Sequence, residues 1–272
     1  EIVGPSRGVL DNFARLAPEL AALPRRCIAH GSAGWPVDEP ALREAPFDAS
    51  GKLRVVVLGR INGAKGLDLL RQLLPELSQH CDLFLVGAGK AAEALFGTSG
   101  VHVLLDYAHA ELPAILGRIR PHMALLPGTV AETFSYTLSE LWRLAIPPVA
   151  TRLGAFAERI EDGVDGILVE PDATQVAACV ARLALDRAPL QRIRETLQQR
   201  TPRSLAQMLA DYQPLLPAGE RAPLRYSLRR ADVASLALAV HADALADLQL
   251  RLTAAEARLT EQQTELERRA EW

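Results

Sequence analysis

Two glutamates eight positions apart, Glu132 and Glu140, carry the most specific chemical signal in the sequence. The apolar run 123–127 ahead of them ends in a proline and predicts a buried strand, and the spacing of apolar residues over 136–142 predicts a helix. Glu132 would lie in the strand-to-helix loop, where open α/β sheets bind ligands, and Glu140 about one and a half turns inside the helix. Both carboxylates could accept hydrogen bonds from vicinal hydroxyl groups of one ligand.

A phosphate-binding element is predicted beside this pair. Arg60 and Lys65 flank a glycine-containing turn directly after the predicted strand 53–58. A diphosphate carries at least two negative charges, so two cations near the helix start at 135–137, with its exposed N–H groups, suit it. The alternative is that these charges are solvated side chains without a shared ligand.

Three segments in this order resemble retaining glycosyltransferases of the GT-B fold, in particular glycosyltransferase family 4. Residues 55–66 (VVVLGRINGAKG) resemble the family's strand followed by G-R and K-G, and residues 132–140 resemble its E-x7-E element. Residues 147–171 resemble its run of P-V-V-A-T, G-G, E, D-G-x-x-G and P-x-D. The resemblance implies an α/β fold whose Rossmann-like parallel sheet is the carboxy-terminal, nucleotide-sugar-binding half of a GT-B fold.

The resemblance also implies a role for each matched residue. Arg60 and Lys65 would bind the donor phosphates and stabilise the leaving charge. Glu132 would hold a sugar hydroxyl and orient the donor, which makes these three the catalytic candidates, and Glu140 would accept hydrogen bonds from the ribose. No cofactor or metal is expected, because no D-x-D motif lies near a strand end. The other donor-binding candidates are Gly59, Ser135, Tyr136, Thr137 and Tyr107, the last at the position of the family's base-binding loop.

Three residues depart from the family pattern. Ser135, Ala145 and Ala155 stand where the family has glycine. A residue with a Cβ tolerates positive φ poorly, so these positions affect the expected pose of the donor.

The order of elements predicts four parts. Residues 1–32 are interpreted as the last βα unit of an amino-terminal GT-B domain, with Ser6 capping a helix whose apolar face holds Val9, Phe13 and Leu16. Residues 33–51 have linker composition, residues 52–215 are predicted to be the donor-binding domain, and residues 228–272 are predicted to be a coiled coil. Because only the last βα unit of an amino-terminal domain is present, the chain is expected to be a fragment of a longer polypeptide.

Strands and helices are predicted to alternate in the donor-binding domain. Strands are predicted at 53–58, 83–86, 101–105, 123–127, 148–151 and 166–169, and helices at 67–80, 110–119, 136–142, 155–162, 174–185 and 190–212.

A leucine repeat marks the final segment. Leu238, Leu245, Leu252, Leu259 and Leu266 recur every seven residues without proline or glycine between them. This repeat predicts a coiled-coil helix and a homo-oligomer, with a dimer favoured. The alternatives are a helix that folds back on its own domain and the start of a stalk toward further domains.

Composition limits the class of protein. With 272 residues, 49% apolar composition and a net charge of −3, the chain can bury one sizeable core and has no basic surplus for nucleic acid. No run of 18 apolar residues occurs, so no transmembrane segment is expected. Three scattered cysteines predict buried thiols in a reducing compartment.

These observations predict a retaining glycosyltransferase fragment in the cytoplasm, with peripheral attachment to the inner face of the membrane as a variant of that location. It would transfer a hexosyl or deoxyhexosyl group from a nucleoside-diphosphate sugar to a glycan or lipid-linked acceptor, in bacterial surface polysaccharide synthesis. Most of the acceptor site would lie in the absent half. The alternative is a non-catalytic sugar-nucleotide-binding or oligomerisation module of a larger protein.

Overall fold

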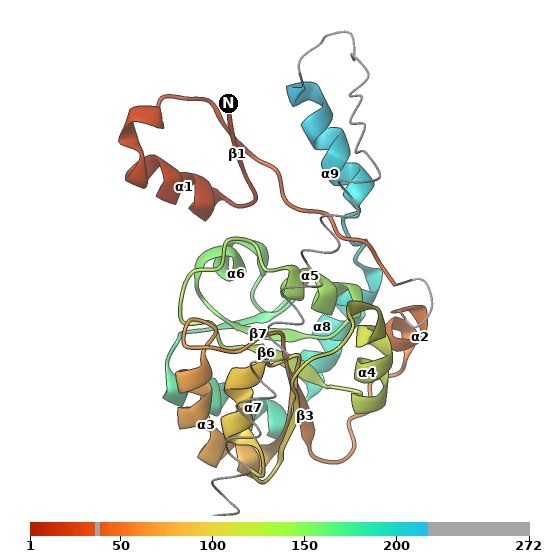
Figure 1. Ribbon diagram of the computed structural model, residues 1–272. Helices are drawn as coiled ribbons and strands as arrows, with labels where there is room; N and C mark the ends of the chain where they lie inside the picture. The colour runs from red at the N-terminus through yellow and green to blue at the C-terminus, as the bar shows by residue number, and fades with distance from the viewer. Residues whose placement is uncertain (36–38, 217–272) are drawn as a thin grey trace, which may run out of the picture. The chain divides into compact units, whose positions relative to one another are not determined.

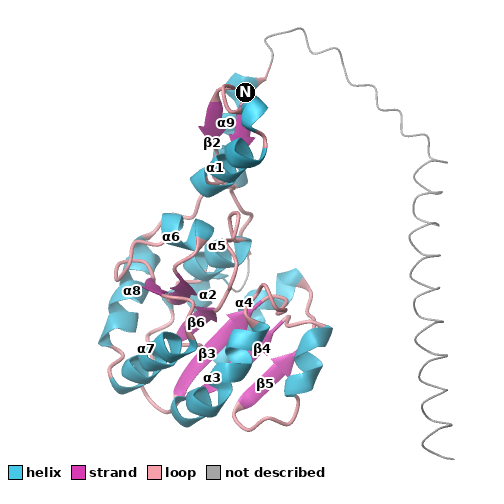
Figure 2. Ribbon diagram, turned by 90° about the vertical axis from the view of Figure 1, so that its left-hand side faces the viewer, coloured by secondary structure: helices cyan, strands magenta, loops and turns pink. Residues whose placement is uncertain are grey.

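A six-stranded parallel sheet forms the centre of the protein in a computed structural model that describes residues 1–35 and 39–216 (Figures 1 and 2). Parallel strands covered by helices on both faces are short apolar runs, and every residue of β6 and β7 is buried. The predicted α/β class with a parallel sheet is confirmed. The strands are β3 (Leu53–Leu58), β4 (Cys81–Val86), β5 (Val101–Leu104), β6 (Met123–Leu126), β7 (Pro148–Thr151) and β8 (Ile167–Val169).

The strand order β5-β4-β3-β6-β7-β8 reverses direction between β3 and β6. The chain moves outward from β3 to β4 and β5, returns to the other side of β3 as β6, and continues to β7 and β8. Because β-α-β crossovers are right-handed, this reversal places α3 and α4 on opposite faces. α3 packs against α7 on its face (Figure 2). The helices are α3 (Leu67–His80), α4 (Leu112–Ile119), α5 (Tyr136–Arg143), α6 (Gly154–Arg159), α7 (Ala173–Leu185) and α8 (Ala188–Gln199), with short 3-10 turns at Lys90–Leu95 and His109–Glu111.

The predicted helix over 190–212 is wrong as one element. α8 ends at Gln199, and α9 (Leu205–Tyr212) begins after an extended segment that contains Pro202. Proline disfavours a helical conformation for the residue before it, which explains the break. Ser204 starts the second helix with a capping box, because its hydroxyl accepts from the Gln207 N–H and the Gln207 side chain accepts from the Ser204 N–H.

The amino-terminal segment has the predicted strand and cap but not the predicted apolar contact. β1 (Ile2–Gly4) and β2 (Arg25–Cys27) pair in parallel, and α1 (Arg7–Leu16) is capped by the Ser6 hydroxyl. Phe13 and Leu16 are exposed, and Leu10 is the buried residue of this helix. α1 contacts β1, β2 and α6, and these neighbours leave 74% of Leu16 exposed.

The cysteine prediction is wrong for one of three thiols. Cys81 and Cys179 are buried, but Cys27 is exposed at the end of β2. The predicted coiled coil of residues 228–272 lies outside the described residues and stays a prediction. Within the described part of the chain, no helix has the length and apolar character that crossing a membrane requires.

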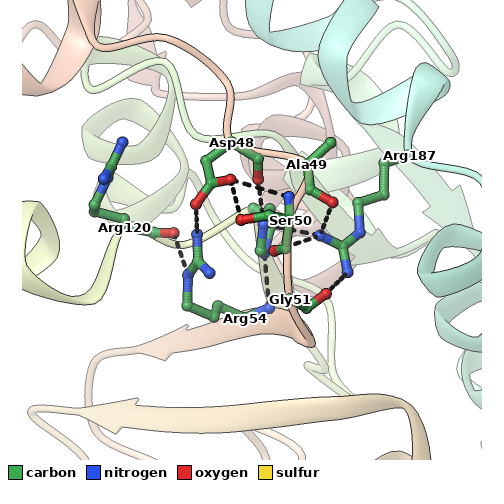
Figure 3. A network of polar contacts seen from close by, with 8 residues as sticks. Asp48, Ala49, Ser50, Gly51, Arg54, Arg120 and Arg187 are labelled. Carbon is green, nitrogen blue, oxygen red and sulfur yellow. Dashed lines mark hydrogen bonds and ion pairs between the residues drawn. The ribbon is translucent and has the colours of Figure 1, made fainter.

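The end of the predicted linker is fixed to the amino-terminal edge of the sheet. Figure 3 shows Arg187 and Arg54 on either side of residues 48–51. Arg187 donates to the Ala49 carbonyl at 2.8 Å and to the Ser50 carbonyl at 3.1 Å. Arg54 pairs with the Asp48 carboxylate and donates to the Arg120 carbonyl. The linker, which also contains α2 (Glu39–Glu44), is therefore attached to the domain and not a free connection.

His122 lies buried beneath this network, with 2% of its surface exposed. Its Nδ1 accepts the Arg54 backbone N–H at 2.8 Å, and its Nε2 lies 2.6 Å from the Asp48 carbonyl oxygen. Because Nδ1 accepts a hydrogen bond, Nε2 carries the proton of the neutral ring and donates it to the Asp48 carbonyl, and the Arg187 guanidinium lies 3.1 Å from Nε2 as a further positive charge beside the ring. Burial and the charge of Arg54 lower the pKa of His122 to about 4.

Lowering the pH from 6.5 to 4 should reduce the free energy of unfolding by up to about 3 kcal/mol through His122 alone. The unfolded state takes up a proton near the ordinary pKa of 6.5, whereas folded His122 stays neutral until about pH 4. Stability from this group is thus complete above pH 6.5 and falls with pH through that window. Urea unfolding between pH 4 and 7.5 measures the slope.

The control is His122→Gln, which keeps polar atoms at the site but does not titrate. It should be less stable at pH 7 and have a smaller pH slope than the wild type. The pKa of Asp48 is lowered to about 2 by hydrogen bonds from Ser50, so its stabilising effect is lost only below pH 3.8. Equal slopes for variant and wild type would contradict the assignment to His122.

Candidate functional site

Two loops far apart in sequence meet where the strand order reverses. The loop after β3, residues 59–66, docks on the loop after β6, residues 127–135. The Thr129 N–H donates to the Ala64 carbonyl at 3.1 Å, and its hydroxyl donates to the Gly63 carbonyl at 3.0 Å. Open α/β sheets bind ligands at this point, outside the carboxyl ends of the strands.

Gly66 makes this docking possible. It has φ of +83°, and a Cβ added to it would lie 1.8 Å from the Pro127 carbonyl oxygen. No other residue type fits this position without moving one of the loops. The glycine of the predicted K-G element therefore sets the distance between the two loops.

Lys65 and Glu132 form an ion pair across the loop junction, 67 positions apart in sequence. Glu132 is mostly buried, with 16% of its side chain exposed, while 47% of Lys65 is exposed. The lysine can therefore turn toward a ligand while the carboxylate stays in place. The structure brings these two predicted catalytic candidates into direct contact.

The third motif segment supports Glu132 from behind. The Ala155 N–H donates to the Glu132 carbonyl at 2.9 Å. A Cβ on Gly154, whose φ is +49°, would lie 2.7 Å from that same carbonyl oxygen. Gly154 thus allows α6 to approach the loop, and Ala155, where glycine was expected, does not have a positive φ.

The start of α5 lies on the same junction. Ser135 caps the helix, since its hydroxyl accepts from the Leu138 N–H at 3.2 Å. Ser135 has φ of 65° and ψ of 90°, and Ala145 at the end of the helix has φ of 52°. Both residues that replace expected glycines at the two ends of α5 therefore adopt positive φ, which costs roughly 1–2 kcal/mol for a residue with a Cβ.

One cleft of about 360 Å³ is bordered by all of these elements, and we call it the switch-point cleft. It unites seven of the nine predicted site residues at the carboxyl ends of β3 and β6. These seven are Gly59, Arg60, Lys65, Glu132, Ser135, Tyr136 and Thr137.

Glu140 and Tyr107 do not line this cleft but lie in a neighbouring group. A carboxylate oxygen of Glu140 lies 2.9 Å from Nε2 of His109, at hydrogen-bond distance. The centroid of the Trp35 ring lies 5.0 Å from that of the His109 ring. Burial, and after it the charge of Glu140, raises the pKa of Tyr107 to about 12. Tyr107 packs against Gly87, where a Cβ would come within 2.5 Å of its ring.

Sequence reasoning assigned no role to two histidines that the structure places at these sites. His109 follows the predicted strand 101–105 by only four residues, and this closeness to a strand end is the signal that could have identified it. His30 lines the switch-point cleft and stacks on Tyr136, with ring centroids 5.3 Å apart. The sequence around His30 contains no signal for a contact with residue 136.

Across residues 1–35 and 39–216, no group of three or more histidine, cysteine, aspartate or glutamate side chains is placed to hold a metal ion.

Residues 52–186 match the family described as Glycosyl transferases group 1. The match covers just under half of the 272 residues and contains every predicted site residue. A comparison with curated proteins gave no significant match.

Solved glycosyltransferase structures share the fold at low identity. Sucrose-phosphate synthase from Thermosynechococcus elongatus is 19% identical, with a TM-score of 0.63 over 78% of this chain and 56% of that one. A glycosyltransferase from Rickettsia africae is 16% identical, with a TM-score of 0.61 over 79% and 62%. HepE from Anabaena, solved in complex with UDP-glucose, is 19% identical, with a TM-score of 0.61 over 79% and 63%. The sheet is therefore the Rossmann-like half of a GT-B fold, and the chain spans 56% to 63% of the length of these proteins.

The strained cap at the start of α5 leads to a stability prediction. Ser135→Gly should raise the free energy of unfolding by up to about 1 kcal/mol, because glycine adopts positive φ freely and loses only a few tenths as a cap. Ser135→Ala should lower it by about 1 kcal/mol, because it keeps the strain and loses the hydroxyl. Urea unfolding of both variants measures the difference.

Ser204 provides the matched control, because it caps α9 with φ of −84°. Ser204→Gly has no strain to relieve and should be slightly less stable than the wild type. If Ser135→Gly were as destabilising as Ser204→Gly, the backbone at residue 135 would not be strained.

Proposed function

We propose that this chain is the donor-binding part of a retaining glycosyltransferase similar to family 4. It binds a nucleoside-diphosphate sugar and transfers the sugar to a glycan or lipid-linked acceptor, in bacterial surface polysaccharide synthesis. One observation carries the proposal: Arg60, Lys65, Glu132 and the start of α5 border one cleft at the reversal of strand order. The match of residues 52–186 to Glycosyl transferases group 1 supports it.

Transfer of the sugar requires that the negative charge developing on the leaving diphosphate be stabilised. When the bond from the anomeric carbon to the diphosphate breaks, the electron pair leaves with the diphosphate, which gains negative charge. The acceptor hydroxyl oxygen bonds to the anomeric carbon and its proton is released. Arg60, Lys65 and the backbone N–H groups that start α5 would stabilise the leaving diphosphate, since fixed donors aimed at developing charge lower the barrier.

The two glutamates would divide the donor between them. Glu132, held against Lys65 and by α6, would orient the sugar in the switch-point cleft. Glu140 would accept hydrogen bonds from the ribose, with Tyr107 beside it stacking on the base. Tyr107 lies in the loop that follows β5, and β5 is separated from β6 by β4 and β3 in the sheet. The donor would therefore extend along the carboxyl edge of the sheet from β6 toward β5.

The HepE complex guides the choice of first ligand. That protein was solved with UDP-glucose, so UDP and UDP-glucose head the set of nucleotides to test here. The relatives are longer than this chain, and the proposed transfer would need an acceptor-binding part in addition to residues 1–216.

The chain should bind at least one of UDP, GDP, ADP and dTDP with unchanged affinity in EDTA and in excess magnesium. The two cations and the helix start would provide the phosphate contacts without a metal. Isothermal titration of the full chain with each nucleotide measures this. Strict dependence on magnesium would contradict the metal-free site, and lack of binding by all four would contradict the proposed function.

Replacing the two glutamates should have unequal effects on that nucleoside diphosphate. Glu140→Ala should weaken binding roughly 10- to 100-fold, because hydrogen bonds to a charged group contribute about 1.5–3 kcal/mol. Glu132→Gln should leave the affinity unchanged or higher, because it removes a negative charge beside Lys65. Titration of both variants is the test.

The matching nucleotide sugar provides the control for Glu132. Glu132→Gln should lose affinity for the nucleotide sugar relative to the bare diphosphate, whereas Glu140→Ala should weaken both equally. Loss of bare diphosphate binding in Glu132→Gln would reverse the two assignments.

A further inference from the structure

We propose that Arg159 is a positioning residue of the switch-point cleft, which it supports through the backbone of the residues that line it. It would hold the backbone at residues 134 and 135 so that the N–H groups at the start of α5 face the donor diphosphate. This inference rests on the proposed function.

The guanidinium of Arg159 bonds to three acceptors, two on the loop before α5 and one inside that helix. Its Nη1 donates to the carbonyls of Phe134 and Ser135, the latter at 2.8 Å, and its Nη2 donates to the Ser139 hydroxyl at 2.8 Å. The fixed fork of an arginine can bridge several acceptors at once, which the single ammonium of lysine does less well. Arg159 thus joins the loop before α5 to the first turns of that helix.

Two aromatic rings hold the guanidinium in place. Its Cζ lies 3.8 Å from the centroid of the Phe134 ring and 5.0 Å from that of Trp142. Among the described residues no carboxylate pairs with Arg159. Burial, and after it the charge of Arg200, lowers the pKa of Arg159 to about 10. A cation kept in such a place without an acid partner depends on the loop carbonyls and the rings for compensation.

Peptide geometry connects these carbonyls to the cleft. In a trans peptide the C=O and the following N–H point in opposite directions. With the carbonyls of residues 134 and 135 directed at Arg159, the N–H groups of Ser135 and Tyr136 are directed away from it. Neither N–H has a hydrogen-bond partner among the described residues, and both residues line the switch-point cleft. The arginine therefore fixes the direction of two free donors.

A hydrogen bond from an arginine to the backbone carbonyl occurs at every non-glycine residue with positive φ in the described part of the chain. These are Arg120, Ser135 and Ala145. Their carbonyls accept from Arg54 at 2.8 Å, Arg159 at 2.8 Å and Arg194 at 3.0 Å, respectively. A charge-assisted hydrogen bond to the carbonyl stabilises a backbone conformation that a Cβ disfavours. At Ser135 this compensation lies directly behind the candidate phosphate site.

The test measures two affinities of the full chain for each variant. One is for whichever of UDP, GDP, ADP and dTDP the wild type binds tightest, and the other for its parent nucleoside. Arg159→Met should weaken diphosphate binding at least tenfold and leave nucleoside binding unchanged, because Glu140 and Tyr107 do not contact Arg159. The diphosphate affinity of Arg159→Lys should lie between those of the wild type and Arg159→Met. Ser139→Ala removes one acceptor of Arg159 and should lower the diphosphate affinity a few-fold.

A double substitution separates positioning from general damage. In Ser135→Gly the backbone no longer carries a Cβ at positive φ, so Arg159→Met should cost less diphosphate affinity in that background than in the wild type. Arg200→Met is the matched control, since Arg200 lies 3.9 Å from the Trp142 ring but bonds to Asp165 and not to the loop. This variant should have unchanged diphosphate affinity even where its melting temperature is lower.

Each other outcome overturns the inference. Unchanged diphosphate affinity in Arg159→Met would show that the loop holds its direction unaided. An equal loss for nucleoside and diphosphate, or the same loss in Arg200→Met, would assign Arg159 a structural role only. All three of these results leave the proposed function standing. A wild type that binds none of the four nucleotides overturns the proposed function and this inference together.

Discussion

The contact of Gly66 with the Pro127 carbonyl is the constraint on which the site depends. It lets the loop after β3 lie directly against the loop after β6, which no side chain at residue 66 would permit. The hydrogen bonds of Thr129 then fix the junction. Lys65 and Glu132 meet because their two loops are held at this distance, and the start of α5 is presented beside them.

Charge is compensated on both sides of this junction. In front, Lys65 is paired with Glu132, so it is not an isolated cation beside Arg60. Behind, Arg159 is compensated by backbone carbonyls and aromatic rings. At the opposite edge of the sheet, Arg187 donates to three carbonyls of segment 49–51 and Arg54 pairs with the Asp48 carboxylate (Figure 3). Arginine thus stabilises irregular backbone at both edges of the sheet.

The departures from the family pattern have a physical consequence at two of three positions. Ser135 and Ala145 have the positive φ that glycine would adopt without strain, whereas Ala155 does not. Both residues therefore adopt a conformation that costs free energy for a residue with a Cβ. Arginine hydrogen bonds to the Ser135 and Ala145 carbonyls, and the Ser135 hydroxyl at the helix start, offset the strain.

Local sequence patterns determined the elements, and tertiary structure decided the contacts. The apolar run before Lys65 and the periodicity after it predicted β3 and α3 with their observed bounds, because burial on a strand or helix face repeats along the chain. The break at Pro202 was also a local signal, and the single helix predicted across it was wrong for that reason. The Lys65–Glu132 ion pair, the support of Glu132 by Gly154 and the bonds of Arg159 join residues 20 to 67 positions apart. No periodicity encodes such pairs. The Lys65–Glu132 pair exists because the strand order reverses between β3 and β6, and the other contacts exist because α6, which follows β7, lies beside the loop after β6.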